Sequence, residues 1–296
     1  MKVHANGLDI EVEVSGEASN PAVLLTMGLG MQLVSWPDAL VNDLVQAGYR
    51  VIRYDNRDIG LTSYFDHVGA PNMVWQIFKS KIGLGVKSAY SLQDMARDGL
   101  GVLDALGISQ AHIVGVSMGG MISQRIAFTA PKRVLSLTSI MSSSGAPRLP
   151  EATPSVVTAM LNRPTSRRTA DIVAHSMKLF ALIGSPAYPP DEKELRERLT
   201  MAVERAYHPV GMLRQLLAVA ADTKRYEHLP QIKSPTLVIH GKADPLVPIE
   251  CGQDTASRIP NARFVAVEGM GHDLPPGVTK ILIDLMIPHL RQHTTA

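Results

Sequence analysis

The chain has 296 residues, of which 45% are hydrophobic and 19% are charged, a composition typical of a globular protein with a large buried core. Its 29 Lys and Arg residues nearly balance 27 Asp and Glu residues, which gives no general attraction for nucleic acid or for an anionic membrane. The single cysteine, Cys251, excludes a disulfide within a monomer and a Cys-x-x-Cys metal cluster. The composition therefore excludes disordered and fibrous proteins. The single cysteine leads us to expect a reducing compartment.

The N-terminal residues and the apolar stretches predict a soluble protein. The first residues lack the continuous apolar segment of a secretory signal. The longest apolar stretch, around residues 22–34, is shorter than the roughly 20 residues that a membrane span needs. We therefore expect a cytoplasmic protein without membrane or nucleic-acid partners, and the sequence leaves its oligomeric state open.

Apolar runs and helical patterns alternate along the chain. Residues 8–14 alternate in polarity like a strand, and Ser91 with Asp94 predicts the start of a helix that Gly107 ends. The Val-, Ile- and Leu-rich runs that predict buried strands are 22–26, 49–54, 111–116, 134–140, 236–240 and 262–267. This alternation predicts an α/β fold with a mostly parallel central sheet and helices on both of its faces.

The alternation stops after about Met141 and resumes near Ser234. The proline-punctuated, apolar segment between them predicts a helical cap over 142–233, inserted after the sixth strand of a core domain formed by 1–141 and 234–296. A second irregular segment, 64–90, carries Trp75 and Phe78. The sequence leaves open whether that segment lies beside a cleft or covers the core.

The strongest local signal is a Gly-x-Ser-x-Gly motif from Gly115 to Gly119, with an apolar strand before it and a helical run, 121–130, after it. This context is typical of a nucleophile on a tight strand-to-helix turn, where the hydroxyl of Ser117 meets the positive end of a helix. An incidental serine in a glycine-rich turn is the less favoured interpretation.

A nucleophilic serine needs an imidazole base and a carboxylate that orients the base. His272 is the best-placed base, because it lies in a glycine-rich loop directly after the last predicted strand. Asp244 follows the preceding strand and precedes Pro245, which gives the chain order Ser, Asp, His. His240 is a rival base, and the rival acids are Asp273 and Asp222.

The tetrahedral intermediate of acyl transfer also needs two backbone amides aimed at its oxyanion. The amide of Met118, directly after the nucleophile, is one expected donor. The other is expected in the loop after the 22–26 strand, where Leu29 follows Gly28. Residues expected to line the substrate pocket are Met27, Gly28, Met160, Phe180 and Met212. No metal-ligand cluster is found in the sequence, and no metal or organic cofactor is expected.

These motifs make the whole chain resemble the α/β-hydrolase superfamily. The segments Gly28-Leu29-Gly30, Ser35-Trp36-Pro37, 53–60, 115–119 and 269–272 look most like bacterial carboxylesterases and the aclacinomycin methylesterase group. The resemblance implies that Ser117, Asp244 and His272 form the catalytic triad and that the cap shapes the substrate pocket. Two departures are Met27, where most relatives have histidine, and Asp58, where the common Asp-x-Arg-Gly pattern has glycine.

We therefore expect a serine hydrolase that cleaves carboxylic esters of short to medium acyl groups, methyl esters among them, through an acyl-enzyme on Ser117. Its expected partner is a small-molecule ester. A carbon–carbon bond hydrolase or a cofactor-free perhydrolase with the same triad is the alternative from another reaction class, because triad residues do not fix the bond cleaved. A noncatalytic ligand-binding relative is the third hypothesis, and it would normally have lost a triad residue.

Overall fold

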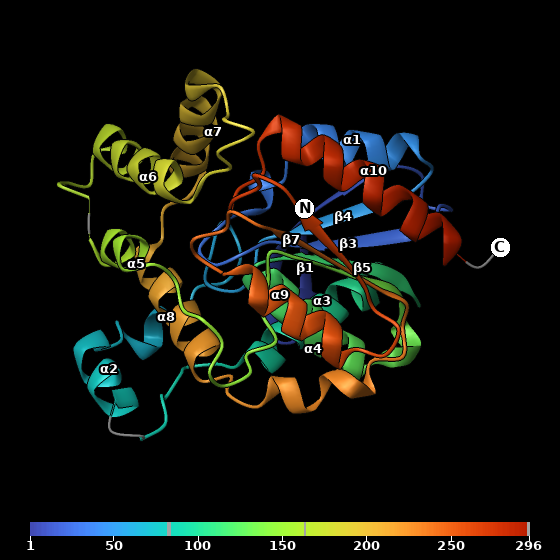
Figure 1. Ribbon diagram of the computed structural model, residues 1–296, viewed down its shortest axis with the longest axis horizontal. Coiled ribbons are helices and arrows are strands. Elements are labelled where there is room, and N and C mark those ends of the chain that lie inside the picture. Colours follow the sequence, from blue (N-terminus) through green and yellow to red (C-terminus); the bar gives the residue numbers. More distant parts are fainter. Residues whose placement is uncertain (82–83, 163, 295–296) are drawn as a thin grey trace.

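The computed structural model describes residues 1–81, 84–162 and 164–294, and its centre is a mostly parallel sheet of eight strands (Figure 1). The strand order is β1-β2-β4-β3-β5-β6-β7-β8. The two pairs β1–β2 and β2–β4 are antiparallel, and all later pairs are parallel. The strands are β1 (Lys2–Ala5), β2 (Leu8–Ser15), β3 (Ala22–Thr26), β4 (Arg50–Tyr54), β5 (Ala111–Val116), β6 (Val134–Ile140), β7 (Thr236–Gly241) and β8 (Arg263–Val267).

Helices cover both faces of this sheet, as the alternation of strands and helices predicted (Figure 1). On one face lie α3 (Leu92–Ala105), α4 (Met118–Thr129) and α9 (Ile249–Arg258), and on the other lie α1 (Asp38–Gln46) and α10 (Pro276–Gln292). Alternate strand residues feed two separate apolar clusters, because successive side chains point to opposite faces. Leu24 and Ile113 belong to the cluster of α3 and α4, whereas Val23 and Val114 belong to that of α1 and α10.

The strands end close to their predicted limits, but β8, predicted as a buried strand, has only Val267 buried, because it lies at the edge of the sheet. All residues of β3, β5 and β7 are buried. The predicted cap of α3 is also present: the Ser91 hydroxyl accepts from the Asp94 amide at 3.1 Å, and the Asp94 carboxylate accepts from the Ser91 amide at 2.9 Å. Such a capping box satisfies amides that the first helical turn leaves free.

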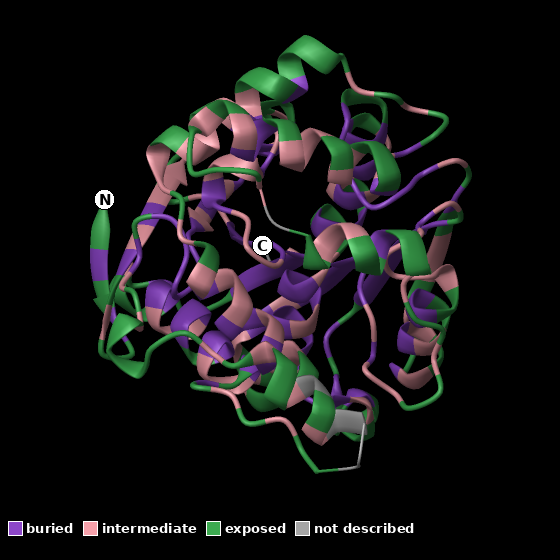
Figure 2. Cartoon of the chain, turned by 90° about the vertical axis from the view of Figure 1, so that its left-hand side faces the viewer, coloured by how far each residue is buried: buried purple, intermediate pink, exposed green. Residues whose placement is uncertain are grey.

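Between β6 and β7 the chain forms further helices beside the sheet domain (Figure 1). They are α5 (Pro154–Leu161), α6 (Thr169–Ile183), α7 (Glu192–Arg205) and α8 (Pro209–Ala220). We call 142–233, which contains them, the cap segment. Figure 2 shows that α5, α6 and α7 keep much of their surface exposed. A small apolar cluster of Val173, Leu195 and Leu199, with Phe180 packed against it, joins α6 to α7.

The 64–90 segment divides into parts with different surroundings. Tyr90 is buried in the core, whereas Trp75 and Phe78 on α2 (Met73–Lys81) are 52% and 50% exposed. Their rings stack on each other with centroids 5.5 Å apart. Helix α2 thus presents an aromatic pair to solvent beside the cap segment (Figure 1).

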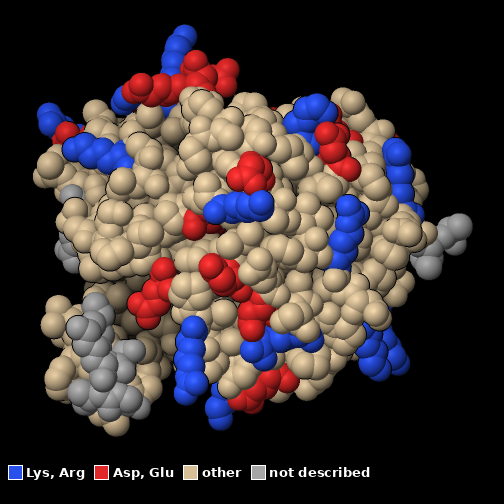
Figure 3. Space-filling view, in the orientation of Figure 1, with Lys and Arg blue, Asp and Glu red and all other residues tan. Residues whose placement is uncertain are grey.

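Charged side chains of both signs are interspersed on the face shown in Figure 3. Among the residues that the structure describes, no helix is both long and apolar enough to cross a membrane.

Candidate active site

The candidate nucleophile lies where β5 passes directly into α4. Ser117 is the residue between them, with φ 55° and ψ −120°, a backbone conformation that residues other than glycine rarely adopt. The Ser117 amide donates to the carbonyl of Ile140 at 2.9 Å, and the Ser142 hydroxyl donates to the carbonyl of Ser117 at 2.8 Å. The surrounding chain therefore fixes this strained turn from both sides.

The two glycines of the motif are required by close backbone approach. A Cβ on Gly115 would lie 2.2 Å from the carbonyl oxygen of Gly119. A Cβ on Gly119 would lie 2.0 Å from the carbonyl oxygen of Thr26. Any larger residue at either position would push α4 away from the sheet, and the turn with it.

Three side chains from three loops form a continuous hydrogen-bonded relay. The Nε2 atom of His272 lies 3.0 Å from the Oγ of Ser117, and its Nδ1 lies 2.7 Å from Oδ2 of Asp244. His272 is 8% exposed and Asp244 6%, whereas Ser117 is only partly buried. The acid and the base are thus shielded from water while the hydroxyl stays accessible.

The second carboxylate oxygen of Asp244 is held by the backbone. Its Oδ1 accepts from the amides of Leu246 and Val247 at 2.9 and 2.8 Å. Because both oxygens are occupied, the carboxylate has one orientation, and that orientation directs Oδ2 at the imidazole.

The rival residues from the sequence have other partners. His240 is fully buried and its Nε2 lies 2.7 Å from the carbonyl oxygen of Val247, while burial lowers its pKa. Asp273 accepts from the Ser185 hydroxyl at 2.5 Å. Asp222 pairs with Arg125 and Arg225. Among the described residues none of the three forms a hydrogen bond with Ser117, although Nε2 of His240 lies 3.7 Å from Oδ2 of Asp244.

The amides of Leu29 and Met118 are placed beside this relay. Met118 follows Ser117 as the first residue of α4, and Leu29 follows Gly28, where a Cβ would lie 3.3 Å from the Cβ of Ser117 and 3.8 Å from its Oγ. In the part of the chain that the structure describes, neither amide donates to a protein acceptor. Within the described residues, both amides therefore lack a protein partner at the positions where the sequence predicts the oxyanion donors.

Residues 21–275 of the chain match the family described as the alpha/beta hydrolase fold. This chain belongs to that family. Over 299 aligned residues the hydrolase is 29% identical to rhodomycin D methylesterase DnrP of Streptomyces peucetius, and the alignment covers 94% of each protein. The match agrees with the resemblance to methylesterases that the motifs indicated.

Other relatives of this hydrolase carry different activities in their names. It is 28% identical to a 2-hydroxy-6-oxononadienedioate/2-hydroxy-6-oxononatrienedioate hydrolase of Burkholderia vietnamiensis, with 92% of this chain and 88% of that protein covered. The solved structure of the enol-lactonase from Burkholderia xenovorans LB400 superposes with a TM-score of 0.74 at 21% identity, over 98% of this chain and 100% of that one. At this identity the superposition bears on the fold alone.

The five residues expected to line the pocket have varied surroundings. Met27 is 3% exposed in the apolar cluster of α1 and α10, so its side chain packs into the core. Phe180 packs into the cluster between α6 and α7, and Met160 is half-buried on α5. Gly28 and Met212 are nearer the relay: Gly28 adjoins Ser117, and Met212 contacts the neighbouring Gly30. A cavity of about 530 Å³ between α5 and α6 contains none of these five residues.

The cap segment also holds the loop of the candidate base. The His272 amide donates to the carbonyl of Ile183 at 2.7 Å, at the end of α6. Two residues further along, the hydroxyl of Ser185 accepts from the Gly271 amide at 2.9 Å and donates to Asp273. Burial raises the pKa of the Asp273 carboxyl, and the Ser185 hydrogen bond opposes that rise. The residues after α6 therefore fix the loop on both sides of His272.

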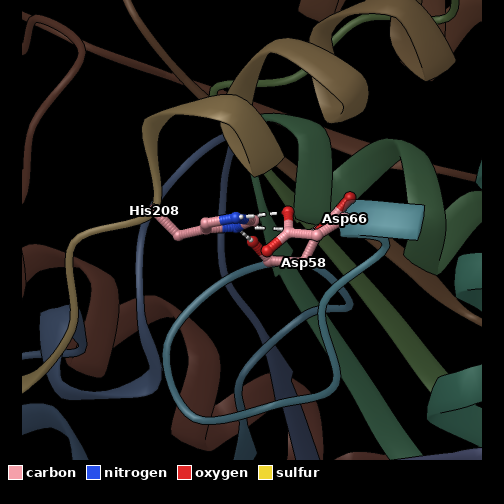
Figure 4. A group of neighbouring side chains, drawn as sticks. All are labelled: Asp58, Asp66 and His208. Carbon is pink, nitrogen blue, oxygen red and sulfur yellow. Dashed lines mark hydrogen bonds and ion pairs between the residues drawn. The ribbon is translucent and has the colours of Figure 1, made fainter. Parts of the chain in front are cut away.

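Among the described residues, only Asp58, Asp66 and His208 bring three possible metal ligands within 4.8 Å of one another (Figure 4). The two carboxylates already have a positively charged partner in the guanidinium group of Arg214, which binds both oxygens of Asp58 at 2.6 and 2.8 Å and one oxygen of Asp66 at 2.9 Å. The hydrogen bond from Arg214 lowers the pKa of Asp66. We therefore interpret the group as the attachment of α8 to the loop after β4.

Sequence reasoning missed polar residues of the cap segment that reach the loops around the site, among them Ser185, Arg205, Arg214 and Gln215. In α8 the only signal is an Arg-Gln pair inside an otherwise apolar helix. Periodicity shows that such a pair interrupts the apolar pattern, but it cannot name the partner that compensates for burial. The complementary signal was Asp58, which stands where the common family pattern has glycine, because this residue is the partner of Arg214.

Proposed function

We propose that this hydrolase is a serine esterase that cleaves carboxylic esters through an acyl-enzyme on Ser117. The observation that carries the proposal is the relay itself, with Ser117, His272 and Asp244 linked at 3.0 and 2.7 Å. A hydrogen-bonded relay of this kind gives the weakly nucleophilic serine a base and fixes the tautomer of that base. The 29% identity to a methylesterase over nearly the whole chain supports the same reaction class.

In the acylation step, His272 Nε2 takes the hydroxyl proton while Ser117 Oγ bonds to the ester carbonyl carbon. The carbonyl oxygen becomes an oxyanion, which the amides of Leu29 and Met118 stabilise. The imidazolium then gives its proton to the alcohol oxygen as the carbon–oxygen bond breaks, which leaves the acyl group on Ser117. Asp244 accepts from Nδ1 throughout and stabilises the charged ring.

In the deacylation step, His272 removes a proton from water as the water oxygen attacks the acyl carbonyl. The oxyanion of the second tetrahedral intermediate accepts hydrogen bonds from the same two amides. Its collapse returns the proton to Ser117 Oγ and releases the carboxylic acid. One water is consumed and one acid and one alcohol are formed, so the enzyme returns to its starting state.

For the substrate we propose uncharged esters of short to medium acyl chains, including methyl esters. The cap segment supports this proposal, because the apolar side chain of Met212 on α8 packs against Gly30, two residues after the Gly28 that adjoins Ser117. Each methylene of an acyl chain adds up to about 0.8 kcal/mol of binding only while apolar surface remains to receive it. The preference should therefore pass through a maximum.

A carbon–carbon bond hydrolase is the second candidate. A relative with 28% identity over 92% of the chain is a hydrolase of a 2-hydroxy-6-oxo dienedioate, and it favours this alternative specifically. Both reactions use a serine hydrolase fold, so the fold does not separate them. Parallel assays with a simple ester and a vinylogous diketone acid decide between them.

The test is kcat/KM for p-nitrophenyl esters from acetate to palmitate, measured with the wild-type protein and with Ser117→Ala. We expect turnover by the wild type with a maximum at short to medium chains, and no enzymatic turnover by the variant. Rates that rise steadily to palmitate would contradict the substrate proposal. Selective turnover of the diketone would replace the ester proposal with the second candidate.

A further inference from the structure

Helix α8 contributes a buried amide side chain to the loop that carries the candidate oxyanion donor. Gln215 is fully buried. Its Oε1 accepts from the Gly30 amide at 2.9 Å, and its Nε2 donates to the carbonyl of Arg57 at 2.8 Å. One side chain of the cap segment thus joins the loop after β3 to the loop after β4.

The Gly30 amide belongs to the central peptide of a tight turn. The turn runs from Gly28 to Met31 and is closed by a hydrogen bond from the Met31 amide to the Gly28 carbonyl at 3.3 Å. Gly30 has φ +70°, which is typical of the third position of a type II turn. Turns of types I and II differ mainly in the orientation of this central peptide. Gln215 binds its N–H and so favours one orientation.

The sheet domain hydrogen-bonds the two ends of this loop, and the side chains of Leu29 and Met31 pack against its two apolar clusters. The Asn56 amide group donates to the carbonyl of Met27 at 2.9 Å, and the Asp55 carboxylate accepts from the Leu33 amide at 2.7 Å. The Gly30 amide contacts α8 instead. Besides Gln215, the side chain of Met212 packs so closely that a Cβ on Gly30 would lie 2.7 Å from its Cγ.

The position of α8 is itself fixed by the residue before Gln215. Arg214 is 2% exposed and binds both oxygens of the buried Asp58, which lies one residue after Arg57. Gln215 therefore approaches the turn from a helix that is anchored to the same loop it contacts. A rigid support of this kind can transmit a defined position to a backbone amide.

We propose that Gln215 is a positioning residue that holds the 28–31 turn, and with it the Leu29 amide, in the geometry that stabilises the oxyanion. The inference rests on the proposed esterase function. A displacement of about 1 Å in a catalytic group can cost about 100-fold in rate. Because the oxyanion forms only in the transition state, loss of the Gly30 contact lowers kcat more than it raises KM.

A purely structural Gln215 would have a different signature. It would satisfy two buried polar groups and attach α8, and its loss would lower the free energy of unfolding without changing how the enzyme treats the carbonyl oxygen. The discriminating readout is therefore the ratio of kcat/KM for an oxygen ester to that for its thionoester. Sulfur accepts hydrogen bonds weakly, so amides aimed at the oxyanion favour the oxygen substrate.

The experiment compares Gln215→Met, which removes the acceptor, with Gln215→Glu, which keeps an acceptor for the Gly30 amide. We expect Gln215→Met to lower kcat by about 10- to 100-fold with little change in KM, and to lower the oxygen-to-sulfur ratio with it. Gln215→Glu should retain most of that ratio. Gln93→Met, on the partly buried surface of α3, is the matched control and should behave like the wild type.

Gln215→Asn provides the same test if Gln215→Met does not fold, because it keeps the amide group but is too short to reach Gly30. A wild-type ratio in Gln215→Met or Gln215→Asn, with only the melting temperature lowered, would overturn the inference and leave the esterase proposal intact. Failure of the proposed function is recognised separately, as a wild-type protein that hydrolyses no ester. That result would overturn the inference as well.

Discussion

The sheet domain and the cap segment both hold the candidate active site, but through different kinds of contact. In the sheet domain, Ser117 and Asp244 follow β5 and β7, whose residues are all buried, and His272 follows the edge strand β8. In the cap segment, Ser185 and Gln215 reach the loops of the site with buried polar side chains. The sheet therefore determines where the loops begin, and the cap segment determines how two of them are oriented.

This difference has an energetic consequence. Apolar packing in the sheet is spread over many residues, so a single truncation costs part of the total. A buried polar contact depends on one partner, and its removal leaves the other partner desolvated and unpaired. Single substitutions in the cap segment should therefore have large and separable effects on stability and rate.

The largest expected effect is in the relay of the sheet domain. Ser117→Ala and His272→Ala should each lower kcat by about 10⁴- to 10⁶-fold, and the double variant should be little worse, because the residues act as a unit. His240→Ala should cost far less, because that ring contacts Val247 rather than Ser117. Steady-state kinetics on folded variants is the measurement. An equally severe loss in His240→Ala would show that the base is misassigned.

The next largest effect should come from the attachment of α8. Arg214→Met leaves the buried carboxylate of Asp58 without its bidentate partner, and breaking a buried pair in this way costs about 3–5 kcal/mol. Denaturant unfolding measures the loss, and kcat should fall because Gln215 moves with the helix. Arg196→Met, which removes an exposed pair with Glu192 on α7, is the control and should change stability by less than about 0.5 kcal/mol. Equal losses of stability in Arg214→Met and Arg196→Met would show that the buried ion pair of α8 stabilises the fold no more than an exposed one.

A smaller effect is expected at the second attachment of the cap segment. Ser185→Ala leaves the Gly271 amide without a partner and removes the hydroxyl bond to Asp273, which keeps its bond from the backbone of residue 185, at a cost of about 1–3 kcal/mol. The rate should fall less than in His272→Ala, because His272 keeps its backbone bond to Ile183. Ser176→Ala, whose hydroxyl only bonds back to Ile172 within α6, is the matched control. Unchanged stability and rate in Ser185→Ala would show that this contact does not support the loop.

The last effect concerns acid stability and arises in the sheet domain. Burial lowers the pKa of His112 to about 4 and that of His289 to about 4. In the unfolded chain histidine titrates near 6.5, so between about pH 6.5 and 4 the unfolded state binds more protons. Stability should therefore fall as pH falls through this window. Denaturant midpoints at pH 7, 6 and 5 test this, and His289→Gln should reduce the slope. A flat profile in the wild type would contradict it.

The difference between the sheet domain and the cap segment also explains which features could be predicted from the sequence. The strands, the turn at Ser117 and the order Ser, Asp, His follow from local patterns, because apolar periodicity and glycine spacing are written in adjacent residues. The partners of Arg214 and Gln215 lie more than a hundred residues away, and no local pattern names them. Met27 illustrates the same limit: its position beside the oxyanion turn suggested a pocket residue, yet its side chain packs into the core.

The most direct test of the central claim is covalent labelling of the wild-type protein with a fluorophosphonate, followed by mass spectrometry of the digested peptides. The relay predicts stoichiometric label on Ser117, loss of activity in step with labelling, and much slower labelling of His272→Ala, because the hydroxyl then lacks its base. Label on another residue, or full turnover by a protein whose Ser117 stays unmodified, would contradict the account.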